Sequence, residues 1–293
     1  MRAPRPKDPS LDIAKVSRVV DTRILGVEEG IVWFRDLEPS LKGGVFRTEK
    51  RFIPYGHQWI DGDDIASVVN VLGSDWITQG SKIVEFENAL CRYIGCKYAV
   101  AVNSGTSALD IAVQALDLPA GSEVITTPFT FVATSNAILY NNLKPMFADI
   151  EKETRNINQN EIRKKMSDKT KAISYVDYAG HPCDIEEIKE IAEERDLYLI
   201  EDACHALSAE YKGKKTGNFA DMTVFSFHPV KHVTTGEGGA IVTNNKRFYE
   251  KLKMLRNHGI DKSALDRFGP ETGWAYDLKF LGRNYRITDF QAC

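Results

Sequence analysis

The sequence predicts an α/β fold in which a mostly parallel sheet is covered by helices on both faces. From about residue 61 onward, short apolar runs alternate with longer segments whose apolar residues recur every three or four positions. The first pattern is typical of buried strands and the second of amphipathic helices. Strands that are apolar throughout are buried on both sides, as they are in a parallel sheet lying between two layers of helices.

Two helices are expected before the first strand. The segment 63–72 (DDIASVVNVL) starts with two aspartates, which favour a helix N-terminus. The segment 81–95 follows, with Ser81 as its expected N-terminal cap and Gly95 as its expected end.

Strands and helices then alternate along the rest of the chain. The expected strands are the apolar runs at 98–103, 123–127, 144–150, 171–176, 197–202, 222–227 and 239–244. The expected helices are 105–116, 131–142, 184–195 and 246–259. Ligands of such sheets bind beyond the carboxyl ends of the strands. The residues that follow each strand are therefore the candidates for a functional site.

Composition indicates an ordinary soluble globular protein of the cytoplasm. Hydrophobic residues make up 43% of the chain and charged residues 27%, and the formal net charge of −3 gives no basic excess for nucleic acid or an anionic membrane. No apolar run approaches the roughly 18 residues of a transmembrane helix, and no apolar core of a signal peptide follows the basic N-terminus. The cysteines form no CxxC pair, so reduced thiols and no metal site are expected. They are Cys91, Cys96, Cys183, Cys204 and Cys293.

A phosphate-binding turn is the first candidate feature. Ser104, Gly105, Thr106 and Ser107 follow the expected strand 98–103 and open the next helix. A helix N-terminus offers free N–H groups and the positive end of a dipole, and the hydroxyls add further donors. The plain alternative is an ordinary helix cap. Neither GxGxxG nor GxxxxGK[ST] occurs here, so a dinucleotide-binding or P-loop site loses its main support.

A carboxylate, a histidine and a lysine follow two other strands. Asp202 ends the strand 197–202, where a buried carboxylate is costly unless it is paired, and His205 lies three residues further on. Asp202 either caps a helix or pairs with a cationic heterocycle. His205 is either structural or flanks the same ligand. Ser226 and Lys231 follow the next strand, and Lys231 is either a solvated charge or a nucleophile that forms a Schiff base with an aldehyde.

These features together are the set that holds pyridoxal phosphate. The helix N-terminus suits the phosphate, the carboxylate suits the ring nitrogen, and the lysine suits the aldehyde. An aromatic side chain is expected over the ring. Phe131, which follows another strand, is the candidate, with a core position as the alternative.

Six stretches of the sequence resemble the DegT/DnrJ/EryC1/StrS family of nucleotide-sugar aminotransferases, a branch of the fold-type I pyridoxal phosphate enzymes. They are SFHPVKHVTTGEGGAIVTN, IEDACHAL, TTPFTFVATSNA, DWITQG, NSGTSALD and NYRITDFQA, and the resemblance covers residues 53–293. The resemblance implies a cytoplasmic homodimer with shared active sites. It also implies large-domain architecture for residues 51–293, with residues 1–50 as an extension of unknown role and the family's small C-terminal domain missing.

The resemblance also implies a role for each site residue. Lys231 would bind the cofactor aldehyde and move the proton, Asp202 would hold the pyridine nitrogen, and Phe131 would stack on the ring. His205 would lie near the 3-hydroxyl. The phosphate would be bound by Thr106, Ser107 and Ser226, and by Asn284 from the neighbouring subunit. The expected sugar-nucleotide contacts are Tyr55, Asp75, Trp76, Ile77, Thr78 and Ser104.

The stretches SYVDYAG and IPYGHQWID are most similar to the family's pseudaminic acid branch. The implied reaction moves the amino group of glutamate to a UDP-linked 4-keto-6-deoxy-N-acetylhexosamine, for pseudaminic acid or a related surface-glycan sugar. One alternative is the same chemistry on a dTDP- or GDP-linked keto sugar. Another is a non-catalytic chain that binds cofactor only. A dehydrating branch of the family has histidine in place of the lysine, so Lys231 argues against it.

Overall fold

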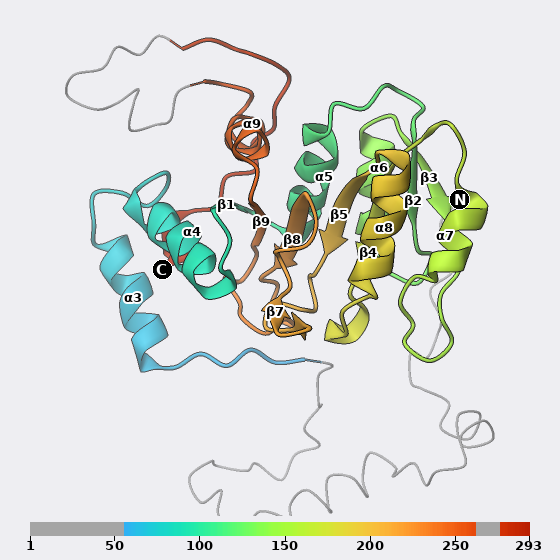
Figure 1. Cartoon of the computed structure of the whole chain (residues 1–293). Coiled ribbons are helices and arrows are strands. Elements are labelled where there is room, and N and C mark those ends of the chain that lie inside the picture. The colour runs from blue at the N-terminus through green and yellow to red at the C-terminus, as the bar shows by residue number, and fades with distance from the viewer. Residues whose placement is uncertain (1–55, 262–275) are drawn as a thin grey trace, which may run out of the picture. The chain divides into compact units, whose positions relative to one another are not determined.

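A seven-stranded mixed sheet forms the centre of the computed structural model, which describes residues 56–261 and 276–293 (Figure 1). The strand order is β1–β9–β8–β5–β4–β2–β3. β9 runs antiparallel to its neighbours β1 and β8, and the other neighbouring pairs are parallel. The strands are β1 (Tyr98–Val102), β2 (Glu123–Thr126), β3 (Lys144–Phe147), β4 (Thr170–Val176), β5 (Tyr198–Asp202), β8 (Met222–Ser226) and β9 (Gly239–Thr243).

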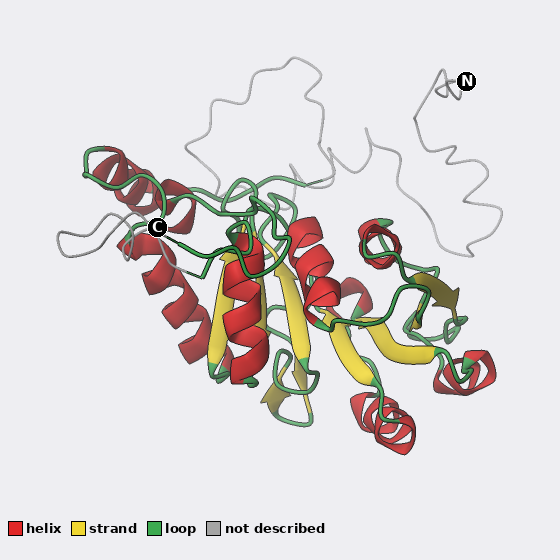
Figure 2. Ribbon diagram, turned by 90° about the horizontal axis from the view of Figure 1, so that it is seen from above, coloured by secondary structure: helices red, strands yellow, loops and turns green. Residues whose placement is uncertain are grey.

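Helices cover both faces of this sheet (Figure 2). One face packs on α5 (Gly105–Ala115), α6 (Ala133–Tyr140) and α9 (Lys246–Arg256). The other face packs on α4 (Ser81–Ile94), α7 (Gln159–Lys165) and α8 (Ile185–Arg195). The predicted α/β architecture with a mostly parallel sheet is confirmed.

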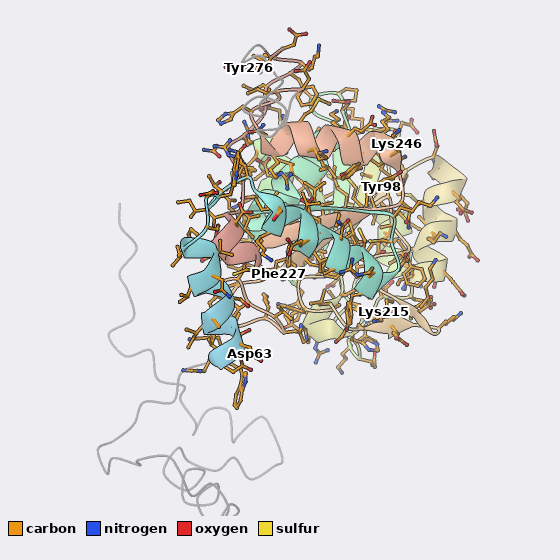
Figure 3. All side chains as sticks on the ribbon, turned by 90° about the vertical axis from the view of Figure 1, so that its left-hand side faces the viewer. Asp63, Tyr98, Lys215, Phe227, Lys246 and Tyr276 are labelled. Atoms are coloured by element: carbon orange, nitrogen blue, oxygen red, sulfur yellow. The ribbon has the colours of Figure 1, made fainter. Side chains whose placement is uncertain are left out.

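The two helices beside the edge strand lie on opposite faces of the sheet. Figure 3 shows α9 on one side of Tyr98 and α4 on the other. Two further helices lie near α4. They are α3 (Gly62–Leu72) and the C-terminal α11 (Asp289–Ala292), which packs against both α3 and α4. No helix among residues 56–261 and 276–293 is long and apolar enough to cross a bilayer.

The strand predictions agree with the structure to within a few residues, and so do the helix predictions apart from one cap. Gly95 ends α4 in the left-handed conformation, with φ of 82°, as predicted. Ser81 is not the cap of α4 but its first helical residue, because Gly80 occupies the cap position. The carboxylate of Asp289 takes over the capping role by accepting hydrogen bonds from the N–H groups of Gly80 (2.8 Å) and Lys82 (3.0 Å).

Several short elements were not predicted. They are α7, α11, the 3-10 turn Tyr178–Gly180 and a small hairpin of β6 (Glu210–Tyr211) and β7 (Lys214–Lys215). Each is too short to show a helical or strand period in the sequence. The extension 1–50 lies outside the described residues.

Candidate active site

The first turn of α5 forms a rigid cradle at the end of β1. Ser104 is the cap residue, and its Oγ accepts the N–H of Ser107 at 3.0 Å. The Ser107 hydroxyl in turn donates to Asn103 Oδ1 at 2.5 Å. Ser107 is buried, while Thr106 is exposed on the outside of the turn. Ser104 is therefore a helix cap, at the positive end of the dipole of an eleven-residue helix, and ligand binding at this turn stays a prediction.

Gly105 brings this turn into contact with the end of β8. A Cβ atom at Gly105 would lie 2.9 Å from Ser226 Cβ and 3.5 Å from Cys204 Sγ. Atoms of these types do not approach to 2.9 Å without a shift, so only glycine permits the observed packing. Ser226, predicted as a phosphate ligand, therefore lies beside the cradle.

Asp202 ends β5 with a buried, oriented carboxylate. Thr134 Oγ1 donates to its Oδ2 at 2.8 Å, and the N–H of Cys204 donates to its Oδ1 at 3.3 Å. Thr134 lies in the first turn of α6, one turn after Phe131. The sequence analysis missed Thr134, although it belongs to the same TTPFTFVATSN stretch. A buried carboxylate held by two donors can still accept a third, which is what a protonated ring nitrogen would supply.

Lys231 lies in the loop between β8 and β9, close enough for its charge to act on two residues that follow Asp202. Burial raises the pKa of the Cys204 thiol well above its usual value, and the Lys231 charge opposes that rise. Burial also lowers the pKa of His205; Lys231 lowers it further, while Asp202 opposes the change. His205 is therefore neutral at pH 7 and above. The charges of Lys231 and Asp202 therefore both act on His205.

Cys204 is where the predicted features meet. It lies next to Gly105 of the cradle and donates its N–H to Asp202, and the charge of Lys231 lowers the pKa of its thiol. Cys204 was predicted only as a reduced thiol. No sequence pattern singled it out, because its contact with Gly105 joins segments far apart in the chain.

Aromatic rings approach His205 from the neighbouring loops. The Tyr178 ring meets the His205 ring edge-on at 6.3 Å, and Phe129 packs against Tyr178 at 4.6 Å. Neither was predicted. Phe131 is 75% exposed, so its stacking on a cofactor ring stays a prediction.

The C-terminal segment brings Asn284 next to β1. The N–H of Asn103 donates to the carbonyl of Tyr285 at 2.9 Å, and the Tyr285 hydroxyl donates to Asp110 in α5 at 2.8 Å. Asn284 itself is exposed. The backbone of the segment is therefore anchored to the cradle's own helix, while the Asn284 side chain is accessible to another molecule.

The stretch 75–78 is fixed to the lysine loop through the C-terminal segment. Thr78 pairs with Thr288, and Gln291 Nε2 donates to the carbonyl of Glu237 at 2.9 Å. Asp75, Trp76, Ile77 and Thr78 are all exposed, so their predicted contacts with a sugar nucleotide stay predictions. Tyr55, the remaining predicted contact, lies outside the described residues.

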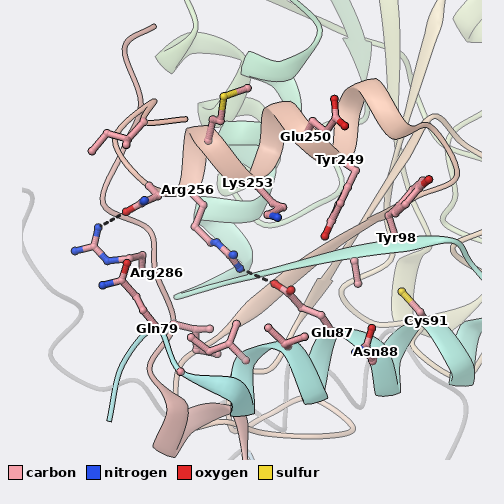
Figure 4. A pocket seen from close by; sticks show the side chains of 18 of the residues that line it. Gln79, Glu87, Asn88, Cys91, Tyr98, Tyr249, Glu250, Lys253, Arg256 and Arg286 are labelled. Atoms are coloured by element: carbon pink, nitrogen blue, oxygen red, sulfur yellow. Dashed lines mark hydrogen bonds and ion pairs between the residues drawn. The ribbon is translucent and has the colours of Figure 1, made fainter. Parts of the chain in front are cut away.

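A cavity of about 750 Å³ lies between α4, α9 and the edge strand β1 (Figure 4), and its lining includes none of Asp202, His205 and Lys231. Its wall carries the ion pair of Arg256 with Glu87, at 2.5 Å, and both side chains are largely buried. Arg256 and Glu87 also bond the carbonyl and N–H of Ala101 at the open edge of β1. The pair thus has a structural task. We therefore place the candidate site at the strand ends, where the chemically suited groups meet, rather than in this cavity.

Comparison with known proteins gives a consistent result. The chain is 46% identical over 240 residues to the UDP-4-amino-4,6-dideoxy-N-acetyl-beta-L-altrosamine transaminase of Campylobacter jejuni, covering 81% of this chain and 61% of the relative. Helicobacter pylori PseC, an aminotransferase involved in the biosynthesis of pseudoaminic acid, superposes with a TM-score of 0.77 at 38% identity, covering 83% of this chain and 63% of PseC.

A third similar structure was solved with its cofactor named. A Streptococcus pneumoniae protein described as a sugar aminotransferase, solved in its pyridoxal phosphate (PLP) form, superposes with a TM-score of 0.75 at 31% identity, covering 83% of this chain and 64% of that one. The fold is thus that of the fold-type I PLP-dependent transferases. The chain spans a little over three fifths of the length of these relatives.

The model of one family matches residues 58–293. Most of the chain, including every described residue of the candidate site, falls inside this match. The chain belongs to the DegT/DnrJ/EryC1/StrS aminotransferase family, whose cofactor is PLP.

Proposed function

We propose that this chain carries the catalytic and cofactor-binding residues of an enzyme that transfers the amino group of glutamate to a keto sugar nucleotide. The observation that supports this most is the meeting of three strand ends at Cys204. There the α5 cradle, the Asp202 carboxylate and the charge of Lys231 come together. We further propose that the substrate is a UDP-linked 4-keto-6-deoxy-N-acetylhexosamine and that the product leads to pseudaminic acid or a related surface-glycan sugar.

The residues present fit the family's cofactor. A helix N-terminus with Ser104, Thr106 and Ser107, lying against Ser226, has the donors that a phosphate ester needs. Asp202 is buried and held by neutral donors, so it has no competing cation among its hydrogen-bond partners. Lys231 stands on the adjoining loop. When bound, PLP supplies an electron sink for the negative charge that develops at carbon during amino transfer.

Asp202 would hold the proton on the ring nitrogen. Thr134 and the Cys204 N–H fix both carboxylate oxygens and so set the plane in which this proton can be held. His205 would lie near the 3-hydroxyl of the cofactor ring, as the resemblance implies. Because its pKa is lowered, His205 would act there as a neutral hydrogen-bonding group and not as a cation.

Lys231 would hold the cofactor through its aldehyde group, and its amine would take up and return the proton at the donor's Cα during amino transfer. This is general acid–base catalysis by a positioned amine. Lys231 is half-buried, and its backbone N–H donates to the carbonyl of His228 at 2.8 Å. The turn made by this hydrogen bond limits how far the lysine can swing from the site.

We also propose that two copies of the chain share their active sites in a cytoplasmic homodimer. The exposed Asn284 supports this, because its neighbour Tyr285 is anchored to the cradle while Asn284 itself remains accessible to a partner. The five free cysteines support a reducing compartment.

The test is an amination assay with purified protein, PLP, glutamate and a panel of keto sugar nucleotides. We expect turnover with the UDP-linked 4-keto-6-deoxy-N-acetylhexosamine to exceed turnover with dTDP- and GDP-linked sugars. A preference for a dTDP- or GDP-linked sugar would contradict the proposed substrate but leave the proposed amino-transfer reaction intact. A cofactor band that forms but never bleaches with glutamate would overturn the chemistry and indicate binding alone.

A further inference from the structure

Two buried carboxyl groups lie side by side on the sheet face opposite Asp202. Successive side chains of a strand point to opposite faces, so Glu201 points toward the layer of α4 and α8 while Asp202 points toward α5 and α6. Asp177 directly follows β4, which is the neighbour of β5. Asp177 and Glu201 are both 0% exposed.

Each carboxyl group has one oxygen that accepts hydrogen bonds and one buried oxygen without a partner among the described residues. The two groups lie close enough for each to shift the pKa of the other. Glu201 Oε2 accepts from Thr223 Oγ1 at 2.6 Å and from the N–H of Gly217 at 2.9 Å. Asp177 Oδ1 accepts the N–H of Cys183 at 3.0 Å. Glu201 Oε1 and Asp177 Oδ2 are buried without a hydrogen-bond partner among the described residues, and so is the hydroxyl of Tyr175, which lies close enough to Glu201 to influence its pKa. Two ionised carboxylates in this arrangement would repel strongly, and a single proton between the two oxygens would satisfy both.

The electrostatic surroundings favour a proton on this pair of carboxyl groups. Burial raises the pKa of Asp177 well above its usual range, and the charge of Glu201 raises it further. Burial also raises the pKa of Glu201, but its hydrogen bonds from Thr223 and Gly217 oppose that change. Of the other described groups whose charges act on Asp177 and Glu201, Tyr175 and Cys183 have pKa values raised mainly by burial, so both are neutral at pH 7.

This carboxyl pair joins the two loops that border His205. The N–H of Asp177 donates to the carbonyl of Asp202 at 3.1 Å. Gly180 approaches the His205 carbonyl so closely that a Cβ there would lie 2.7 Å from the oxygen, and the Tyr178 ring contacts the His205 ring. The loop 177–183 therefore packs directly against the loop that carries Asp202 and His205.

We propose that Asp177 and Glu201 share one proton and act as a hydrogen-bonded unit that positions the loop 177–183 against His205. The two are positioning residues, since Glu201 lies on the sheet face away from Asp202. The catalytic importance of this unit rests on the proposed function. Its existence does not, because it can be measured in the absence of substrate.

Amide substitutions test the shared proton. In Asp177→Asn the amide nitrogen can donate to Glu201 Oε1, and in Glu201→Gln it can donate to Asp177 Oδ2, so each single variant keeps the hydrogen bond. In the double variant two donor NH₂ groups face each other. We expect thermal midpoints near that of the unsubstituted protein for the singles, and a fall of roughly 5 °C beyond their sum for the double.

Infrared spectroscopy provides the direct readout. At pH 7 the unsubstituted protein should show the C=O band of a buried protonated carboxyl group, and each single amide variant should lack it. Glu123→Gln is the control, because Glu123 is also buried, with 6% of its surface exposed, yet its pKa is lowered by hydrogen bonds from Ser167 and Lys144. A spectrum without the band, or a band that survives both single variants, would overturn the shared proton.

The His205 ring signal in NMR tests the positioning role. We expect it to be unchanged in the two single amide variants and shifted in Asp177→Ala, which removes the link without introducing a donor. An unchanged His205 signal in a folded Asp177→Ala protein would overturn the positioning role. Both readouts are taken without turnover, so a failure of the proposed aminotransferase function would leave them intact and be recognised separately.

Discussion

At the scale of single residues, the candidate site combines charged and titratable side chains that are buried or half-buried, namely Asp202, His205 and Lys231. Lys231 and Asp202 oppose each other at His205, because the lysine lowers and the aspartate raises the pKa of the imidazole. Burial is the largest influence and lowers it. The lowered pKa favours the neutral imidazole at His205.

Replacing Lys231 by alanine should abolish the Schiff-base absorbance band and all amino transfer. The reason is that Lys231 is the lysine whose charge reaches the residues around Asp202. Absorbance spectra and the amination assay measure both effects. Lys246→Ala, at an exposed ion pair with Glu250, serves as the control and should retain the band. A borohydride-reducible adduct in Lys231→Ala would mean that another lysine anchors the cofactor.

Replacing Asp202 by asparagine should retain part of the cofactor binding but lower turnover by roughly a hundredfold or more. The amide can keep the hydrogen bond from Thr134 but cannot stabilise a proton on the ring nitrogen. Cofactor titration and kcat separate the two effects. Asp221→Asn is the control at the opposite end of the same strands, where the aspartate accepts the N–H of Leu199. Turnover close to normal in Asp202→Asn would reduce Asp202 to a structural role.

At the scale of elements, the position of α5 relative to β8 determines the shape of the cradle. Ser104 starts the helix, and Gly105 lets its first turn contact Ser226. The next strand along the sheet contributes in the same way, because Gly239 of β9 approaches Ser104 so closely that a Cβ would lie 2.5 Å from its carbonyl oxygen. Backbone packing therefore holds the helix end from two sides.

Gly105→Ala should weaken binding of PLP roughly tenfold, because its Cβ would force the cradle away from Ser226. Equilibrium titration of PLP measures the change. Gly62→Ala is the matched control, since a Cβ there meets nothing within 4 Å, and it should bind PLP normally. If Gly105→Ala binds as tightly as the unsubstituted protein, the phosphate does not use this turn.

At the scale of the whole molecule, the buried pair of Asp177 and Glu201 should make stability depend on pH. The pKa of Asp177 is raised in the folded state, so the folded protein holds a proton that the unfolded chain releases above about pH 4. The free energy of unfolding should therefore fall as pH rises from about 4 toward the raised pKa. Asp177→Asn should show a flatter profile in chemical denaturation. An identical slope in both proteins would contradict this origin.

A shared active site should allow two inactive chains to complement each other. Lys231→Ala removes the anchor of its own site, and Asn284→Ala removes the phosphate contact that we propose it makes in the partner's site. Mixed dimers of the two variants would contain one site with both residues intact, so partial amination activity should return on mixing. If mixing restores nothing while both variants still form dimers, each site is made from a single chain.

The sequence alone was sufficient for the alternation of strands and helices, since burial on both faces leaves a local pattern of apolar residues. It also predicted which residues follow the strand ends, including Ser104, Asp202 and Lys231. It did not reveal Thr134 as the donor to Asp202, or Cys204 as the point where the strand ends meet. Those contacts join segments far apart in the chain, and no local spacing records them.

The tertiary structure likewise decided how α4 begins and which acids lie together. Ser81 had the right chemistry for a cap, but Asp289, more than two hundred residues away, reaches the N–H groups first and leaves Ser81 inside the helix. Asp177 and Glu201 become neighbours only because β4 and β5 pair in parallel. The sequence determined the main strands and helices and the candidate groups at the strand ends through local patterns, whereas the long-range pairing of strands decided which groups lie together.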